Sequence, residues 1–156
     1  MSNATEAADV SELADHLGYW LRQVSNHVSR GFALKLAAAD ASVAEWVLLR
    51  MLYGEAPQAP SRLAEAMGLT RGAVTKLADR MIERGLIARA ADPRDGRAQT
   101  LALTAKGRRL TPKLAALADK NDAECFGWLS DPDRRFLRKI LEETVARLAL
   151  HTPPID

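Results

Sequence analysis

The sequence of 156 residues has little cysteine and no long hydrophobic run, and each shortage excludes a class of protein. Its one cysteine, Cys125, has no second thiol for an internal disulfide or a structural zinc site, which is typical of a reducing compartment. No apolar stretch approaches the roughly 20 residues of a membrane helix, and residues 1–9 lack the features of a secretory signal. We therefore expect a cytoplasmic protein with no membrane partner, metal or cofactor.

The chain has enough apolar residues for a folded core, and its charge is unevenly distributed. Hydrophobic residues make up 47% of the sequence, which excludes a disordered protein and fits one domain or two small coupled lobes. The net charge is +2, but residues 62–109 contain eleven Lys and Arg against five Asp and Glu, a local balance of +6 that leaves −4 elsewhere. A lobe that contacts a polyanion is expected to have this charge; a solvated basic face is the alternative.

The central segment LAEAMGLTRGAVTKLADRMIERG has the pattern of a helix-turn-helix. Ala64 lies where two helices would touch, Gly68 suits a left-handed helix end, and Val74 faces the same contact. The expected helices cover residues 60–68 and 70–85. The second helix would present a polar face to base edges and phosphates, and that face consists of Arg71, Gly72, Thr75, Lys76, Asp79 and Arg80. Arg80 has the alternative of an ion pair with Asp79 or Glu83 on its own helix.

A basic hairpin, LIARAADPRDGRAQTLAL, follows directly. It predicts strands over residues 86–91 and 98–103, with a tip at 92–97 between them. Arg94 and Arg97 on the tip fit insertion into a narrow, electronegative minor groove, and the alternative is a mobile charged turn. A helix sized for the major groove next to an arginine-tipped loop predicts DNA binding more specifically than either feature alone.

Two amphipathic helices are expected before the helix-turn-helix. Apolar residues recur at three and four positions from residue 9 or 11 to 38, and Ser11 is the expected cap. The second helix, residues 42–53, opens with a capping box formed by Ser42 and Glu45.

Two more helices are expected after the hairpin. One begins at the cap Thr104 and reaches about residue 129, with Pro112 predicting a kink or short break at residues 109–111. The other begins at a Ser-x-x-Asp cap at Ser130. The terminal helices, 9–38 and 104–150, have more apolar surface than one chain would cover, which predicts a symmetric homodimer.

These motifs resemble the MarR family of bacterial winged-helix transcription regulators over nearly the whole chain. The resemblance rests on LAEAMGLTRGAVTKLADRMIERGLIAR and DPRDGRAQTLALTAKGR, in which an Asp-Pro-x-Asp-x-Arg tip followed by Leu-Thr-x-x-Gly is the most specific part. It implies a single domain, mainly α with a small β-hairpin wing, in which a winged helix-turn-helix lobe over residues 42–103 lies between dimerisation helices. It also implies a homodimer that binds a pseudo-palindromic operator in double-stranded DNA and represses until a small ligand, often phenolic, or an oxidant releases it.

The resemblance also assigns residues. Gly96 replaces an arginine that many relatives have at the tip, and no reactive cysteine lies in the first helix, so the peroxide-sensing branch of the family is not expected. It implies major-groove contacts by Thr70, Arg71, Thr75 and Lys76, wing contacts by Arg94 and Arg97, and support of the tip by Asp92 and Asp95.

An effector pocket is a weaker prediction. Family pockets lie between the dimer helices and the DNA-binding lobe, so an aromatic or phenolic effector would contact side chains on the first two helices. The alternative is that the tryptophans belong to the core and the histidines to the surface or an interface. The candidate residues are His16, Trp20, His27, Trp46, Arg50 and Tyr53.

Two other functions compete with a sequence-specific regulator. An architectural DNA-binding protein would share the basic lobe but need no distinct recognition face. A thiol-dependent enzyme would need Cys125 beside a histidine, but no catalytic motif surrounds Cys125 in the sequence. Cys125 is more simply explained as a small buried hydrophobic residue. We therefore predict a DNA-binding regulator rather than an enzyme.

Overall fold

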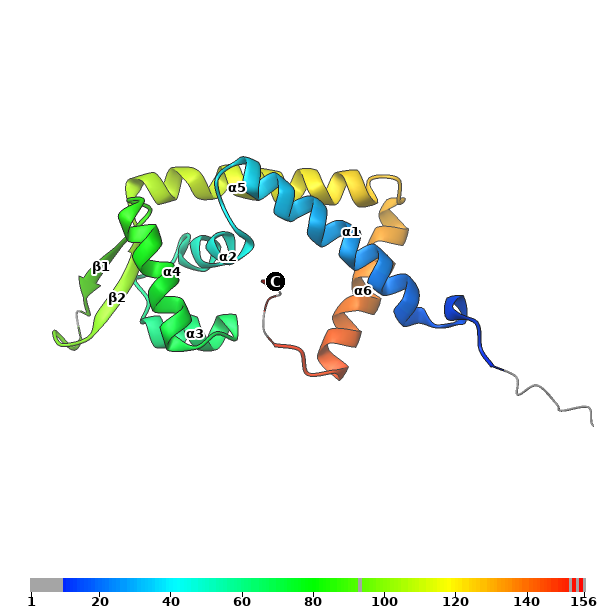
Figure 1. Ribbon diagram of the computed structural model, residues 1–156, viewed down its shortest axis with the longest axis horizontal. Helices are drawn as coiled ribbons and strands as arrows, with labels where there is room; N and C mark the ends of the chain where they lie inside the picture. Colours follow the sequence, from blue (N-terminus) through cyan, green and yellow to red (C-terminus); the bar gives the residue numbers. More distant parts are fainter. Residues whose placement is uncertain (1–9, 93, 152, 154, 156) are drawn as a thin grey trace, which may run out of the picture.

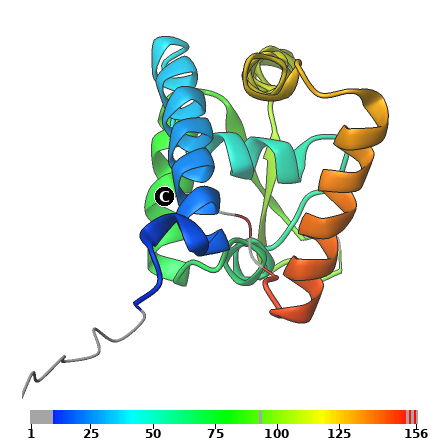
Figure 2. The ribbon, with the colours of Figure 1, turned by 90° about the vertical axis from the view of Figure 1, so that its right-hand side faces the viewer.

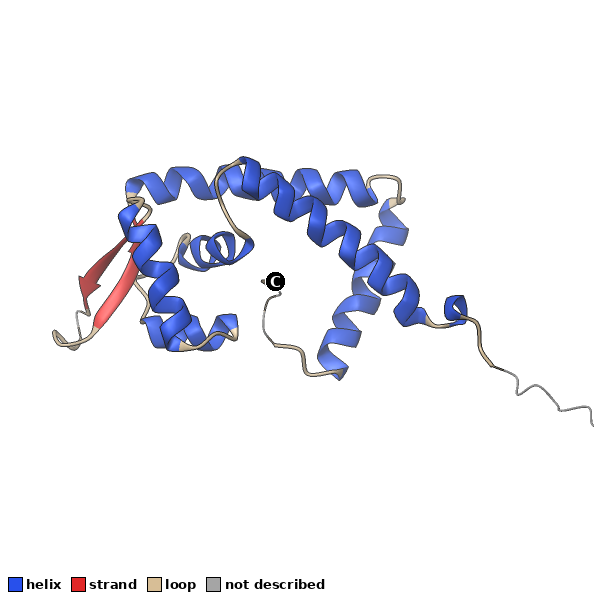
Figure 3. Cartoon of the chain, viewed as in Figure 1, coloured by secondary structure: helices blue, strands red, loops and turns tan. Residues whose placement is uncertain are grey.

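The structure is mostly helical, with one small hairpin among its described residues (Figure 3). It is a computed structural model that describes residues 10–92, 94–151, 153 and 155. No helix in this part of the chain is long and apolar enough to cross a membrane. The predicted fold class is confirmed. In chain order the elements are η1 (Leu13–Asp15), α1 (Leu17–Ala38), α2 (Val43–Leu52), α3 (Pro60–Met67), α4 (Arg71–Glu83), β1 (Ile87–Ala91), β2 (Gln99–Leu103), α5 (Ala105–Phe126) and α6 (Asp131–Arg147).

A winged lobe contains most of the buried apolar residues. Helices α2, α3 and α4 pack with the hairpin and the first half of α5 (Figure 1). Ala64 and Val74 are buried where α3 and α4 meet, and Gly68 ends α3 at a φ of 65°, as the sequence predicts. The core of the lobe includes Leu48, Leu49, Leu63, Met67, Met81, Leu101 and Leu114.

The hairpin confirms both predicted strands to within one residue. β1 and β2 pair in antiparallel register from Ile87 opposite Leu103 to Ala91 opposite Gln99. Gln58, before α3, exchanges two backbone hydrogen bonds with Leu101, at 2.9 and 2.8 Å. These bonds attach the base of the wing to the helix-turn-helix.

Helix α5 passes through Pro112 without a break, so the predicted short break near residues 109–111 is wrong. Proline removes one backbone donor, but its neighbours Thr111 and Leu114 are buried, and this packing holds the helical path. Near its start, a Cβ on Gly107 would lie 2.1 Å from the carbonyl oxygen of Leu86. Glycine therefore lets α5 contact the backbone at the base of the wing directly.

Helix α1 begins later than predicted. Ser11 does not cap it; instead a short 3₁₀ turn, η1, is followed by His16 in an extended conformation, with φ −95° and ψ 125°. The carboxylate of Asp15 accepts a hydrogen bond from the backbone N–H of Glu12 at 2.8 Å, and the Trp20 indole donates to the carbonyl of Ala14 at 2.8 Å. These local bonds compete with a continuous helix.

The two terminal helices form arms at the end of the molecule away from the wing. They overlap in Figure 1, but Figure 2 shows α1 and α6 on opposite sides of α5. Leu36 is the one fully buried residue described in α1, and no described residue of α6 is buried. Large apolar side chains are exposed on both arms: Leu17, Trp20, Leu21, Val24, Phe136, Ile140, Leu141 and Val145.

Candidate nucleic-acid interface

Helix α4 has one buried and one polar face. Thr70 caps it by accepting a hydrogen bond from the backbone N–H of Ala73 at 3.1 Å, so its predicted local role is confirmed. The inward residues Val74, Leu77, Ala78 and Met81 are buried in the lobe. The outward residues are all exposed, as the sequence predicts: Arg71, Thr75, Lys76 and Arg80.

Local contacts orient this polar face. The Thr75 hydroxyl donates a hydrogen bond to the carbonyl of Arg71 at 2.9 Å. Its methyl group and the lone pairs of its oxygen therefore remain available to contact a ligand. Asp79 pairs with Arg89 of β1 at 2.6 Å. Arg80 therefore does not have Asp79 as a partner, and no ion pair described in the structure includes Arg80. The ion pair to Arg89 attaches α4 to the wing.

The wing tip is organised by two carboxylates. Asp92 accepts a hydrogen bond from the backbone N–H of Arg94 at 2.8 Å, and Asp95 accepts one from that of Arg97 at 3.1 Å. Each carboxylate thus binds the backbone of an arginine rather than its guanidinium group. Arg94 and Arg97 are exposed, and the ion pairs of the described residues include neither. Pro93 lies outside the described residues.

This arrangement suits binding to duplex DNA. The N-terminus of α4 carries a partial positive charge, and Arg71 is its first residue. A helix of this size fits the major groove, where an arginine can donate two hydrogen bonds to guanine. The arginines of the tip lie on a separate loop of the same lobe, sized for the adjacent minor groove.

The six candidate effector residues do not share one cavity. Trp46 lines an open cavity of about 620 Å³ between α1, α2 and α5, with Arg138 of α6 at its wall. Trp20 and His27 line a separate cavity of about 460 Å³ between α1 and the end of α5, together with Cys125. His16, Arg50 and Tyr53 line neither of these two cavities.

The larger cavity has lining residues that the sequence did not identify. Phe32 packs edge-on against Trp46, with ring centroids 6.2 Å apart. Asn121 is buried, donates to the carbonyl of Val28 at 3.1 Å and accepts from Lys35 at 3.1 Å. These contacts join residues about 90 positions apart, and no local pattern predicts them.

Lys35 has a second partner at the same crossing of α1 and α5. Its ammonium group pairs with the carboxylate of Glu124. The hydrogen bond from Lys35 lowers the pKa of Glu124 below its ordinary value, aided by the charges of Lys35 and Lys120. The ion pair thus favours the ionised carboxylate at neutral pH.

Comparison with known proteins agrees with this geometry. Residues 40–98 match the sequence model of the MarR family. The HTH-type transcriptional repressor Rv2887 of Mycobacterium tuberculosis is 28% identical over 127 residues, which cover 81% of this chain and 91% of that protein.

Solved structures are also similar. The structure of CouR from Rhodococcus jostii RHA1 bound to p-coumaroyl-CoA has a TM-score of 0.71 and 28% identity, over 86% of this chain and 95% of that one. The Rv2887 complex with DNA has a TM-score of 0.70 and 26% identity, over 83% and 97%. The Rv2887 complex with p-aminosalicylic acid has a TM-score of 0.65 and 26% identity, over 83% and 98%.

The fold and the exposed polar face of α4 are those of a winged helix-turn-helix protein. The family match over residues 40–98 and the similar repressors and solved structures support a MarR-family regulator of transcription.

Proposed function

We propose that the protein binds a specific, pseudo-palindromic operator as a homodimer and represses transcription until an effector releases it. The observation that carries this proposal is the exposed polar face of α4 next to an arginine-tipped wing on the same lobe. The solved complex of the similar repressor Rv2887 with DNA supports it. Because the operator lies on the chromosome, we also propose that the protein works in the cytoplasm.

The proposed DNA-binding residues divide into those that contact bases and those that contact the DNA backbone or the minor groove. Arg71, at the start of α4, is placed to read a base, whereas Lys76 and Arg80 lie farther along the helix and suit phosphates. Thr70 and Thr75 offer hydroxyl or methyl contacts to the DNA. On the wing, Arg94 and Arg97 would enter the minor groove, supported by Asp92 and Asp95, which order the tip.

The arms support the proposal of a homodimer. Helix α6 has an apolar stripe, none of its described residues is buried, and Phe136 remains 65% exposed on it. Exposed apolar surfaces of this extent usually mark an interface. A two-fold dimer would present two α4 helices to one face of the duplex about one helical turn apart, which matches a palindromic site.

Selection from a random duplex pool, followed by competition, tests the DNA-binding proposal. The full protein should enrich an inverted repeat and keep it in the presence of excess scrambled duplex. Arg71→Ala should lose this preference, and the control Arg135→Ala on α6, with the same change in charge, should keep it. If scrambled DNA competes as well as the enriched site, the protein is a sequence-tolerant architectural binder and the proposal is wrong.

We propose an aromatic acid as the effector class, bound in the larger cavity. Trp46 and Phe32 offer aromatic walls there, and Arg138 offers a cation for a carboxylate. The structures of CouR with p-coumaroyl-CoA and of Rv2887 with p-aminosalicylic acid support this class. A site at Trp20 and His27 is the alternative, because those residues line the second cavity.

Titration with salicylate separates the two cavities. It should change the tryptophan fluorescence and release the enriched duplex with the same midpoint. Trp46→Phe should weaken both responses, whereas Trp128→Phe, in the second cavity, should leave the release unchanged. Absence of both signals at millimolar salicylate would contradict the proposed effector class.

A further inference from the structure

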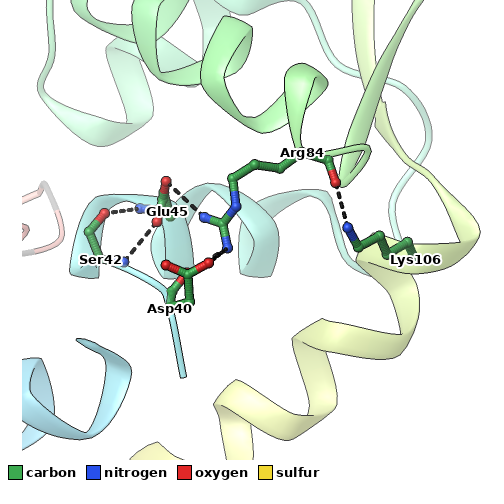
Figure 4. Close-up of polar contacts among 5 residues, drawn as sticks. All are labelled: Asp40, Ser42, Glu45, Arg84 and Lys106. Atoms are coloured by element: carbon green, nitrogen blue, oxygen red, sulfur yellow. Dashed lines mark hydrogen bonds and ion pairs between the residues drawn. The ribbon is translucent and has the colours of Figure 1, made fainter. Parts of the chain in front are cut away.

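Arg84, at the C-terminal end of the recognition helix α4, joins that helix to the turn between α1 and α2. Its guanidinium group lies 3.2 Å from a carboxylate oxygen of Glu45 and 3.1 Å from one of Asp40 (Figure 4). It also donates to the backbone carbonyl of Asp40. Arg84 thus uses both of its terminal nitrogens on a segment that lies about 40 residues earlier in the chain.

The two partners of Arg84 differ in burial, because the Asp40 carboxylate is 96% exposed whereas that of Glu45 is mostly buried. The Glu45 side chain is only 11% exposed, and its second oxygen accepts a hydrogen bond from the backbone N–H of Ser42 at 2.8 Å, which caps α2. Asp40 has a φ of 56°, the left-handed conformation of a tight turn. The carbonyl of Arg84 accepts from Lys106 of α5 at 2.7 Å. The contacts therefore fix the end of α4 against two other helices.

We propose that Arg84 is a positioning residue for DNA recognition, which sets the angle of α4 and thereby the place of Arg71 at its other end. This inference rests on the proposed function. Helix α4 has 13 residues and is therefore roughly 20 Å long. A tilt of about 3° at its C-terminal end moves its N-terminus by roughly 1 Å, which is enough to break a hydrogen bond to a base.

The geometry favours positioning over simple stabilisation. The mostly buried pair of Arg84 with Glu45 adds little net stability, because removing both charges from water costs about as much as their attraction returns. The pair with Asp40 adds little because its carboxylate is exposed to solvent. A planar guanidinium group that binds two carboxylates, however, fixes an orientation that a single ammonium group does not. The contribution of Arg84 should therefore be visible in base recognition more than in the free energy of unfolding.

A double variant separates the two roles. Arg84→Met alone leaves the Glu45 carboxylate buried without its cation, so its Tm should fall. Arg84→Met with Glu45→Gln neutralises both groups and keeps the net charge, so its Tm should return close to that of the wild type. If Arg84 positions α4, the affinity of this double variant for the enriched operator should still fall about tenfold. Its affinity for scrambled duplex should fall less than about twofold.

Two milder variants keep the test decisive if the double variant does not fold. Asp40→Asn retains the left-handed turn, which asparagine tolerates, and removes one charge partner. It should lower the preference for the operator by a smaller factor at an unchanged Tm. Arg84→Lys should restore part of the preference that Arg84→Met loses. Arg135→Met on α6 is the matched control and should change neither quantity.

The outcomes are distinguishable. If the double variant, or Asp40→Asn when the former is unfolded, has wild-type Tm and wild-type preference, Arg84 has a structural role only and the inference is wrong. An equal loss of affinity for both duplexes also overturns the inference, because such a loss would come from changed charge or from unfolding rather than from a displaced base contact. If the wild type itself prefers no duplex, the proposed function fails and this inference fails with it.

Discussion

The winged lobe and the helical arms use apolar residues in opposite ways. In the lobe, Leu48, Leu49 and Met81 are fully buried by their own chain. On the arms, Leu17 is 86% exposed and Ile140 is 45% exposed. Both regions are amphipathic in sequence, so amphipathicity alone does not reveal which surface covers an apolar face. The lobe is complete as one chain, whereas the arms have surfaces that suit a second one.

The two regions also use charge differently. Cations on the arms pair with carboxylates, as Arg134 does with Asp122 at 2.6 Å. On the lobe, Arg89 pairs with Asp79, but the ion pairs of the described residues include none of the arginines of the α4 face and wing tip. The wing-tip carboxylates Asp92 and Asp95 bind backbone amides instead. A surface that leaves its cations exposed is suited to phosphates.

The largest expected effect tests whether the lobe is complete. Leu49→Ala removes a fully buried side chain and should lower the free energy of unfolding by about 2 to 5 kcal/mol. Its matched variant, Leu141→Ala, removes a side chain that is 41% exposed on α6. The second variant should instead make Tm depend more strongly on protein concentration, because it weakens the proposed dimer. Thermal unfolding at several concentrations would refute the comparison if both variants behave alike.

The next effect concerns the reading face of the lobe. Arg71→Ala should lose roughly 1 to 3 kcal/mol of binding free energy on the enriched operator and much less on scrambled duplex. The reason is that a base contact is lost while phosphate contacts remain. Binding isotherms on both duplexes measure this difference. An equal loss on both would assign Arg71 to the backbone.

A smaller effect is expected at the wing. Arg97→Ala should weaken binding to operator and scrambled duplex alike, because a minor-groove arginine acts mainly through charge. The slope of log affinity against log salt should fall by about one unit per subunit, hence about two per dimer. Titrations at several salt concentrations give this slope, and an unchanged slope with lost specificity would make Arg97 a reader instead.

The smallest effect concerns the arms. The lowered pKa of Glu124 means that its ion pair with Lys35 stabilises the fold above the unfolded pKa of glutamate, and that this contribution is lost as pH falls through the folded pKa. Glu124→Gln should therefore lower Tm slightly at pH 7, with the difference from wild type vanishing in acid. Glu142→Gln, on α6, is the control. If the difference in Tm between Glu124→Gln and wild type grows in acid, the ion pair does not stabilise the fold in the way proposed.

Local signals made much of the fold predictable. Ser42, Thr70, Thr104 and Ser130 each cap the helix that follows, because a cap needs only residues within one turn. The polar face of α4 was predictable for the same reason, since helical periodicity assigns its sides. The break at His16 was not, because it depends on specific side-chain bonds rather than on periodicity.

The features that the sequence did not predict depend on tertiary contacts. The expected effector residues share neighbouring helices, but a cavity also needs α5 and α6 as walls, so Trp46 and Trp20 fall into different cavities. Similarly, nothing near Arg84 in the sequence indicates Asp40 and Glu45 as its partners. Such contacts depend on how helices cross, which one sequence does not specify locally.

Gly107 lets α5 and the base of the wing come into direct contact. No side chain separates α5 from the carbonyl of Leu86, and the Thr104 hydroxyl donates a hydrogen bond to the same carbonyl at 3.1 Å, so the start of the helix contacts the base of the wing directly. Helix α5 runs from this joint to α6 at the opposite end (Figure 1). A side chain at residue 107 would push α5 away from the base of the wing. The absence of a side chain at Gly107 thus places the helix that reaches the arms in direct contact with the base of the wing.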